Sequence, residues 1–361
     1  MQTGIVSYGT YIPKHRIDVQ DIYKVWRNVT PEIFDRMSLR ERAVLMPDED
    51  SITLAVAAAQ LALDRSGLKR EQIGAVLFGS GTNPYATKPA ATVVQDALGL
   101  RKDIIAYDIQ FAGKSGTSAM ITASAFVASG MADYVLAIGT DTLNRHFPPG
   151  TQMEYAASAG AFACIIGKDK LIAKLEGSVS YSSDLADYFR TEGERYIQLG
   201  GGWMGYISSW GLLEHVAPAG ERLFAKLNLD PKKDFNYVAI HQGNGIQPMM
   251  GAGKLGLDMF IVMPYVLTSY IGDCGSASSL IPLAHILDNA NPEERILNLS
   301  YGWGSGSDAL SFVTTKDIEA KRPQKDLVMS QIEDKIMLDY GLATKYEYKY
   351  IRSPMMMTNY L

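Results

Sequence analysis

The sequence has few cysteines, no long apolar run and no excess of basic residues. Two cysteines, Cys164 and Cys274, are too few for a disulfide framework. No apolar run is long enough to cross a bilayer, and the N-terminal residues lack the basic region of a signal peptide. We therefore expect a soluble cytoplasmic protein that does not bind membranes. The net charge is -5 without a basic stripe, so nucleic acid is not an expected partner.

Histidine is also scarce, and the five histidines show no ligand-like spacing, so we predict no metal site. The chain is instead rich in small and apolar residues, with 33 glycines among 361 residues and 47% hydrophobic content. This composition is typical of a globular protein with closely packed helices and tight turns. The length indicates two domains or one duplicated domain.

Helix and strand patterns alternate along the first half of the chain, which favours an α/β fold with helices covering a sheet. An acidic stretch before Ser51 predicts a helix N-terminus there. The segment Ser115–Ser129 is small or apolar all round, so we expect a fully buried helix. The predicted helices are 51–66, 88–98 and 115–129, and the predicted strands are 75–78, 104–111, 134–138 and 161–166.

The second half repeats this order of elements without obvious residue identity, so a duplication is indicated by element order alone. Two ordinary α/β halves that are alike by chance are the alternative. The predicted helices are 220–227, 248–255 and 276–287, and the predicted strands are 237–240, 296–300 and 309–314. We assign 1–170 to the N-terminal half, 171–315 to the C-terminal half and 316–361 to a C-terminal extension.

Two segments lie outside this repeat. An insertion at 181–215 is rich in glycine and aromatic residues, and a long irregular segment of this kind usually has a function or packs on a partner. The tail is charged and rich in tyrosine, with a possible helix at 331–340. We interpret the tail as either a solvated appendage or a docking element.

The segment Asp108–Thr117 carries the most chemical information, because it leads from a strand into the buried helix. A residue in such a turn lies at a helix N-terminus, where free N–H groups favour an anion. A cysteine there would have a lowered pKa and would be a good nucleophile. This sequence has Gly113 at that point of the turn.

The turn resembles the nucleophile turn of 3-hydroxy-3-methylglutaryl-CoA synthases, a family in the thiolase superfamily, and especially the short archaeal type. The resemblance covers nearly the whole chain and implies a duplicated thiolase fold, two βαβαβαββ-type halves layered α-β-α-β-α. Each matching segment is weak alone, and the set is specific. The other segments are 4–13, 84–89, 192–194, 241–245, 301–308 and the tail around 339–340.

Carried over residue by residue, the resemblance implies a vestigial active site. The nucleophilic cysteine of the family falls at Gly113 and its general-base glutamate falls at Gly81. The family's histidine is kept as His241, and an expected asparagine appears as Asp273. Acyl transfer of this type needs a thiolate to carry the acyl group and a carboxylate to deprotonate the second substrate, and glycine supplies neither.

Other residues are candidates to replace the missing groups. Cys274 is the alternative nucleophile, because its loop is expected near the same pocket, although a free cysteine more often packs as a small apolar residue. Ser115 lacks an evident base and is interpreted as a helix cap. His241 is interpreted as a relic held by packing, with contact to a partner's ligand as the alternative. Cys164 lies in an apolar strand and is assigned to the core.

Within the superfamily, the chain most resembles the synthase-like subunits of bacterial monoacetylphloroglucinol acetyltransferases, which make the antibiotic diacetylphloroglucinol. This resemblance implies a non-catalytic subunit that works with a thiolase-like catalytic subunit and a small OB-fold, zinc-ribbon-like subunit. We expect a homodimer formed through strand 104–111, and no cofactor. Two alternatives are a condensing enzyme that uses Cys274 or another group, and a scaffold subunit of an isoprenoid-pathway thiolase/synthase complex.

Overall fold

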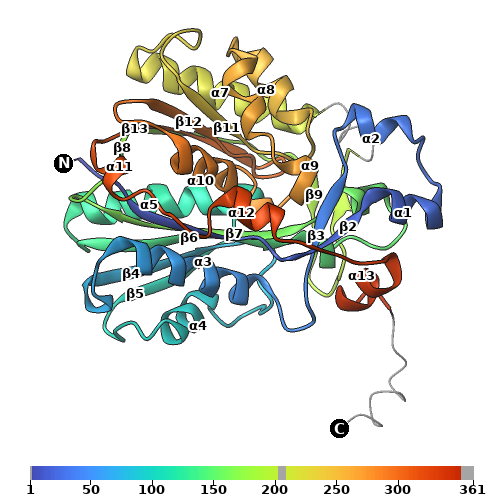
Figure 1. The fold of residues 1–361 in the computed structure, drawn as a ribbon. Coiled ribbons are helices and arrows are strands. Elements are labelled where there is room, and N and C mark those ends of the chain that lie inside the picture. Colours follow the sequence, from blue (N-terminus) through green and yellow to red (C-terminus); the bar gives the residue numbers. More distant parts are fainter. Residues whose placement is uncertain (1, 202–208, 351–361) are drawn as a thin grey trace.

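The structure is a computed structural model that describes residues 2–201 and 209–350 (Figure 1). In this part of the chain the central sheet has the order β11-β12-β13-β8-β1-β7-β6-β4-β5. The first half of the chain contributes β1 (Gly4–Tyr11), β4 (Ile73–Gly79), β5 (Ile105–Ile109), β6 (Tyr134–Thr142) and β7 (Ala159–Gly167). The second half contributes β8 (Ala173–Ser182), β11 (Tyr237–Ile240), β12 (Arg295–Leu299) and β13 (Gly306–Thr314).

The pairing of the strands confirms the predicted repeat. In the first half, β4 pairs with β6 in parallel, and β7 pairs antiparallel with both β6 and β1. In the second half, β11 pairs with β12 in parallel, and β13 pairs antiparallel with both β12 and β8. The two series meet where β1 and β8 pair over two residue pairs only. Among the described strands, β5 has no counterpart in the second half.

The helices divide the molecule into layers (Figure 1). Helices α5 and α10 lie between the two parts of the sheet, α3 and α4 cover the outer face of the first part, and α7 and α8 cover the outer face of the second part. The chain therefore has the expected α-β-α-β-α thiolase-like architecture. The bounds are α3 (Ser51–Ser66), α4 (Ala90–Ala97), α5 (Ser115–Ser129), α7 (Trp210–Leu227), α8 (Gln247–Leu255) and α10 (Leu280–Asn289).

The helix in the middle of the first half begins and ends where the sequence predicts, but its burial differs. The first ten residues of α5 are buried or half-buried between the two parts of the sheet, as its small and apolar side chains require. Ala125 and Ser129 in the last turns are exposed, so the prediction of a fully buried helix was wrong at this end. For α3, the predicted cap is confirmed, because Asp50 accepts hydrogen bonds from the backbone N–H groups of Ile52 and Thr53.

A small second sheet lies beside the layers and was not predicted. It has the order β14-β2-β3 and is joined by two short helices near the N-terminus. These elements are too short to show a periodic pattern in the sequence. Their bounds are β2 (His15–Asp18), α1 (Val19–Trp26), α2 (Glu32–Arg36), β3 (Glu41–Val44) and β14 (Ile336–Met337).

The segment predicted as an insertion is shorter than expected. Strand β8 continues to Ser182 and α7 begins at Trp210, because the apolar face of α7 extends far beyond the predicted helix 220–227. Between them lies a hairpin of β9 (Tyr188–Phe189) and β10 (Gln198–Leu199). Part of the glycine-rich stretch, Gly202 and Trp203, lies outside the described residues.

The described part of the tail packs on the body of the protein, so it is not a solvated appendage. The predicted helix 331–340 was wrong, since α12 (Val328–Glu333) ends before β14, and α13 (Tyr340–Tyr346) follows. Beyond α13, the fully buried Glu347 pairs with Arg42, and the buried Lys349 pairs with Glu154 at 2.7 Å. Buried charges are costly unless they are paired, so these contacts fix the tail to the first half.

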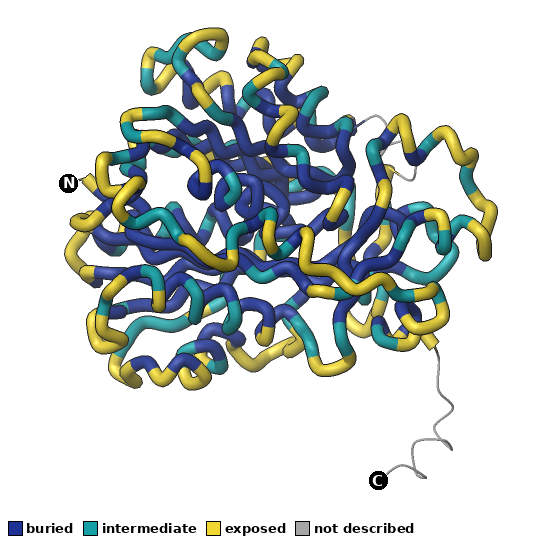
Figure 2. Tube along the Cα trace, in the orientation of Figure 1, coloured by how far each residue is buried: buried dark blue, intermediate teal, exposed yellow. Residues whose placement is uncertain are grey.

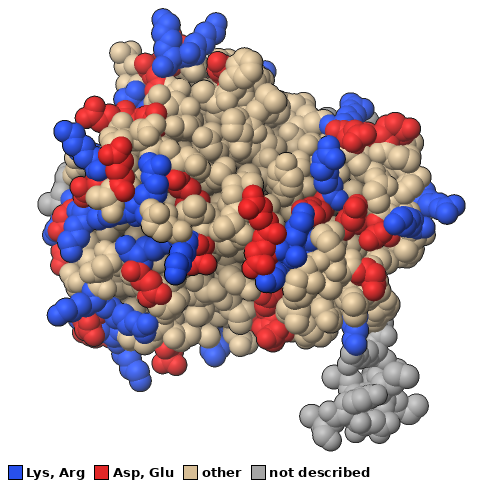
Figure 3. Space-filling view, viewed as in Figure 1, with Lys and Arg blue, Asp and Glu red and all other residues tan. Residues whose placement is uncertain are grey.

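The surface agrees with the absence of a basic stripe in the sequence. On the face shown in Figure 3, lysine and arginine side chains are interspersed with aspartate and glutamate. Figure 2 shows that the buried backbone is concentrated in the strands and in the central helices, with exposure mainly on the outer helices and loops. Within residues 2–201 and 209–350, no helix combines the length and the apolar character that a membrane span requires.

Candidate functional site

The turn that the sequence singles out lies where β5 meets α5. Ala112 adopts a left-handed backbone conformation with φ 45°, and a short 3₁₀ helix, Ala112–Lys114, leads directly into α5. The hydroxyl of Ser115 accepts a hydrogen bond from Phe111 N–H at 2.7 Å and donates one to the carbonyl of Ala112 at 2.8 Å. Ser115 therefore holds the turn, and its interpretation as the helix cap was wrong, because the cap position is Lys114.

At Gly113 there is no room for a side chain. A Cβ atom on Gly113 would lie 2.4 Å from the carbonyl oxygen of Tyr301, 2.9 Å from Trp303 Nε1 and 3.0 Å from His241 Cε1. Distances this short require backbone or ring atoms to move. Gly113, the predicted nucleophile position, thus lacks both a reactive side chain and the space for one.

The predicted base position is less crowded than Gly113. Gly81 lies in the loop after β4, and a Cβ atom there would lie 3.2 Å from the Cα of Ala112 and 3.5 Å from Trp303 Cζ3. One side chain, Trp303, therefore approaches both glycines. Its indole is 4% exposed, and its backbone has φ 48°, an uncommon conformation for a bulky residue.

A buried carboxylate organises the loops around this centre. Asp141, at the end of β6, accepts hydrogen bonds from Gly81 N–H at 2.9 Å, from the Thr82 hydroxyl at 2.6 Å and from the Ser276 hydroxyl at 2.6 Å. Ser276 belongs to the loop that follows Asp273. Burial raises the pKa of Asp141, while these hydrogen bonds oppose the shift. Asp141 thereby ties the loop of the first half to the loop of the second half.

The retained histidine and its neighbour are both buried, and burial shifts the pKa of each toward its neutral form. His241 Nε2 lies 3.8 Å from Asp273 Oδ1. Burial lowers the pKa of His241 to about 3, and burial raises the pKa of Asp273 to about 7. Because His241 is uncharged at neutral pH, the contact is not an ion pair. His241 packs against the ring of Tyr301, with ring centroids 5.9 Å apart.

The alternative nucleophile is poorly suited to the task. Cys274 is fully buried, and its thiol lies 3.4 Å from the carbonyl oxygen of Ala159. Burial, with a smaller effect of the nearby Asp273, raises the pKa of Cys274 well above its ordinary value. A thiol that resists ionisation is a weak nucleophile. Cys164 is likewise fully buried in β7, as predicted, and burial raises its pKa as well.

Little empty volume remains at the centre. The cavity beside Trp303, His241 and Asp273 is about 10 Å³, room for one water molecule. Several buried polar atoms around it have no hydrogen-bond partner among the described residues, including Trp303 Nε1, His241 Nδ1 and Ser209 Oγ. The described residues contain no group of three or more His, Cys, Asp or Glu side chains placed to hold a metal ion.

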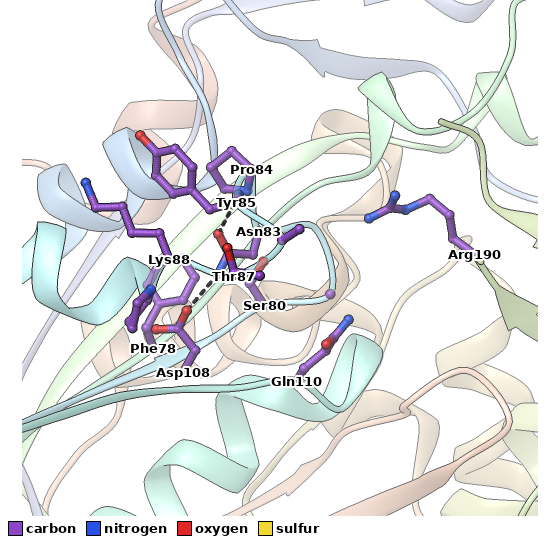
Figure 4. Close-up of a pocket in the computed structure, with 13 residues that line it drawn as sticks. Phe78, Ser80, Asn83, Pro84, Tyr85, Thr87, Lys88, Asp108, Gln110 and Arg190 are labelled. Carbon is purple, nitrogen blue, oxygen red and sulfur yellow. Dashed lines mark hydrogen bonds between the residues drawn. The ribbon is translucent and has the colours of Figure 1, made fainter. Parts of the chain in front are cut away.

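Larger cavities open outside this centre. One of about 460 Å³ lies under the loop 83–89, with Asp108 and Gln110 on its floor and Arg190 reaching in from the opposite side to Lys88 (Figure 4). A second, of about 150 Å³, lies between Gly81, Trp303 and the β9 hairpin. Gly81, Gln110 and Arg190 line both, so the two are adjacent.

Known proteins resemble this chain over nearly its whole length. The family model "Thiolase, N-terminal domain" matches residues 40–159. The hydroxymethylglutaryl-CoA synthase of Methanopyrus kandleri is 40% identical over 348 residues, covering 96% of this chain and 98% of the relative. That of Archaeoglobus fulgidus is 41% identical over 346 residues, covering 96% and 98%. This chain belongs to the hydroxymethylglutaryl-CoA synthase family.

Solved structures of the family agree in fold at lower identity. The HMG synthase of the curacin biosynthetic pathway, in complex with holo donor-ACP, has a TM-score of 0.85 at 21% identity, covering 96% of this chain and 88% of that chain. An HMG-CoA synthase complexed with CoA has a TM-score of 0.85 at 18% identity, covering 98% and 92%. At this identity, the likeness concerns the thiolase-like fold alone.

The structure brings together all four residues of the predicted vestigial site of this synthase-family chain. Gly81 and Gly113 meet the same indole, His241 lies against the Gly113 side, and Asp273 lies beside His241. Trp303 and Asp141 shape the centre and were not predicted from the sequence. A tryptophan among the glycines of 301–306 was a visible signal of a special backbone position, whereas nothing in the sequence marked Asp141.

Proposed function

We propose that this chain is a non-catalytic, structurally required subunit of a multicomponent C-acetyltransferase that transfers an acetyl group onto a phloroglucinol-type aromatic ring. The observation that supports the non-catalytic part is the indole of Trp303 packed against Gly81 and Gly113. Acyl transfer in a synthase of this family would need a thiolate and a carboxylate at these positions. The acceptor is proposed from the sequence resemblance alone.

Other polar groups near the turn are already engaged. The amine of Lys114 is buried and lies 2.6 Å from the carboxylate of Asp308, so it is held as a paired cation. The hydroxyl of Ser115 bonds the backbone of the turn, and Cys274 is a buried thiol. None of these three is placed as an activated nucleophile, which needs an adjacent base or a lowered pKa.

A subunit without its own chemistry needs partners that supply it. We propose a thiolase-like subunit with an active cysteine and a small OB-fold, zinc-ribbon-like subunit, together with a second copy of this chain. Strand β5 supports the dimer, because it pairs only with β4 among the described strands and its residues are half-buried or exposed. Unpaired edge strands are usually covered in soluble proteins.

The deciding experiment is reconstitution of acetyl transfer from purified components. The three subunits are mixed, and then each is omitted in turn, while diacetylated product is measured by chromatography. We expect activity only with all three present, and co-elution of this chain with the other two in size-exclusion chromatography with light scattering. Full activity from the thiolase-like and OB-fold subunits without this chain would defeat the proposal.

A condensing enzyme is the second candidate, and the comparisons taken alone favour it. The relatives at about 40% identity carry the name hydroxymethylglutaryl-CoA synthase, and nothing in these names points to an aromatic acceptor. The two candidates differ in whether the isolated protein becomes acylated. Intact mass after incubation with acetyl-CoA is expected to show no covalent acetyl group, and a Cys274→Ser variant serves as the control. A stoichiometric acetyl adduct in the wild type that this variant lacks would establish the condensing-enzyme candidate.

A further inference from the structure

The cavity of about 150 Å³ beside the closed centre has a composition of its own. Its walls include the rings of Trp303, Tyr188 and Phe189 and the side chain of Ile197, while Gln110 and Arg190 lie where it joins the wider cavity. Four of these six residues lie in or next to the β9–β10 hairpin, which belongs to the segment between the two halves. They are Tyr188, Phe189, Arg190 and Ile197. The insertion therefore forms a wall of this cavity.

The size of the cavity selects a small ligand. A cavity of roughly this volume has room for one benzene-sized molecule, and polar as well as apolar side chains line this one. Tyr188 and Trp303 lie with ring centroids 5.6 Å apart at 42°, and Phe147 packs on the far side of Tyr188 at 6.3 Å. This row of rings fixes the wall in place. Aromatic walls favour a planar ring, which can stack or pack edge-to-face against them.

The polar groups select the substituents of that ring. Arg190 carries a permanent positive charge and five N–H donors, and the carbonyl of Glu194 accepts from one of them at 2.9 Å. In Figure 4 its guanidinium points into the wide cavity toward the loop of Asn83, with Gln110 below it. A cation and an amide at the mouth of an aromatic cavity are suited to an acidic hydroxyl group, whose oxygen accepts charge-assisted hydrogen bonds.

We infer that this cavity binds a single planar ring with acidic hydroxyl groups, a phenol, with the ring between Trp303 and the β9 hairpin and the hydroxyls toward Arg190 and Gln110. Gly81 lines this cavity without a side chain to fill it, and Trp303 forms another part of the lining. The inference rests on the proposed function only for the choice of phloroglucinol as the probe. It assigns a binding role, and no bond is made or broken on this subunit.

Isothermal titration calorimetry of the isolated protein tests the ligand class. Phloroglucinol is expected to bind one-to-one with a dissociation constant below about 1 mM. Cyclohexanetriol keeps the hydroxyls and loses planarity, and trimethoxybenzene keeps planarity and loses the acidic protons. Both are expected to bind at least about ten-fold more weakly. No saturable binding of phloroglucinol, or equal binding of either analogue, would overturn the inference.

Two surface variants test whether phloroglucinol binds in this cavity. Arg190→Gln removes the charge, and Phe189→Ala removes a wall that is 41% exposed, so neither change empties the core. Each is expected to weaken phloroglucinol binding about ten-fold or more. Arg222→Gln removes another exposed arginine, which lies over the ring of Tyr181 outside the cavity, and should leave binding unchanged. Binding that both cavity variants leave intact would place the ligand elsewhere and refute the site.

The outcome separates this inference from the proposed function. If phloroglucinol does not bind the isolated chain but the chain is still required in the reconstituted transfer assay, the cavity inference fails and the proposed function stands. If phloroglucinol binds with the expected variant pattern but transfer proceeds without this chain, the proposed function fails and the binding site stands.

Discussion

The two halves of this protein repeat one order of strands, yet they contribute differently to the centre between them. The first half supplies Gly81 and Gly113, where side chains are missing, and the second half supplies Trp303, His241 and Asp273, which fill and line the space. A duplicated fold can thus keep one architecture while its two halves contribute different side chains to the centre between them. Four predictions test whether the two halves contribute to the centre in these different ways.

The largest effect is expected from the residue of the second half that fills the centre. Trp303→Ala removes a buried indole and should lower the free energy of unfolding by about 3–5 kcal/mol, because large core truncations leave cavities. Gly81→Ala in the first half meets contacts of 3.2 Å and should cost about 1 kcal/mol or less. Urea denaturation measures both. A Trp303→Ala cost near that of Gly81→Ala would show that the indole does not support the centre.

Restoring the nucleophile in the first half should harm the protein and return no synthase activity. Gly113→Cys places a Cβ atom 2.4 Å from the Tyr301 carbonyl oxygen, and overpacking of this kind costs about 1–3 kcal/mol. Condensation turnover should stay absent, because Gly81 still provides no carboxylate.

The clash at Gly113 can be separated from the chemistry with a second substitution. A Trp303→Ala background removes the contact with Trp303 Nε1 at 2.9 Å and keeps the one with the Tyr301 carbonyl, so the added cost of Gly113→Cys should fall in part, with a coupling of about 0.5–3 kcal/mol in a double-mutant cycle. Strict additivity would mean that Trp303 is not the obstacle. Synthase turnover by Gly113→Cys alone would mean that the role of the missing carboxylate was misjudged.

The opposite pKa shifts of His241 and Asp273 in the second half predict opposing effects of pH on stability. The folded-state pKa of Asp273 rises from 3.8 to about 7, so the folded state binds more protons than the unfolded state in this range and stability falls as pH increases. The pKa of His241 falls from 6.5 to about 3, so the unfolded state binds more protons and stability increases with pH. Between about pH 4 and pH 6.5 the two effects offset each other.

Single substitutions should reveal how Asp273 and His241 each contribute to the pH dependence of the free energy of unfolding. Asp273→Asn should make the free energy of unfolding increase more steeply with pH, and His241→Gln should make it decrease, each by up to about 1.4 kcal/mol per pH unit. Denaturant titrations at several pH values across this window measure the slopes. Identical slopes in the wild type and both variants would show that neither group is shifted by burial.

The smallest effect on stability is expected at β5, the strand of the first half that has no counterpart among the described strands of the second half. A substitution there should still have a clear effect on assembly. Tyr107 on β5 is 36% exposed, and Tyr107→Lys should change the free energy of unfolding by no more than about 0.5 kcal/mol while favouring the monomer. Phe260→Lys, at an 82% exposed position in the second half, is the matched control and should leave assembly unchanged. Light scattering reads out the mass. A wild-type monomer, or a dimer that only Phe260→Lys disrupts, would contradict a β5 interface.

The sequence predicted the repeating elements well, because their signals are local. The α3 helix follows from an acidic cap and an alanine-rich apolar face, and β11 follows from a short apolar run. The sequence did not reveal the small sheet β14-β2-β3, whose two- to four-residue strands come from opposite ends of the chain. It also placed a helix across 331–340, where pairing with β2 instead imposes a strand.

For the candidate site, the sequence gives the residue types but not the side chains that surround them. The sequence by itself determined that residues 81 and 113, the predicted base and nucleophile positions, are glycines, since folding cannot supply a missing side chain. Only the tertiary structure decided that the indole of Trp303 packs beside both glycines, that the thiol of Cys274 is buried against the Ala159 carbonyl, and that burial shifts the pKa values of His241 and Asp273 toward their neutral forms. These properties depend on burial and on contacts between segments more than a hundred residues apart, which no local pattern in the chain encodes.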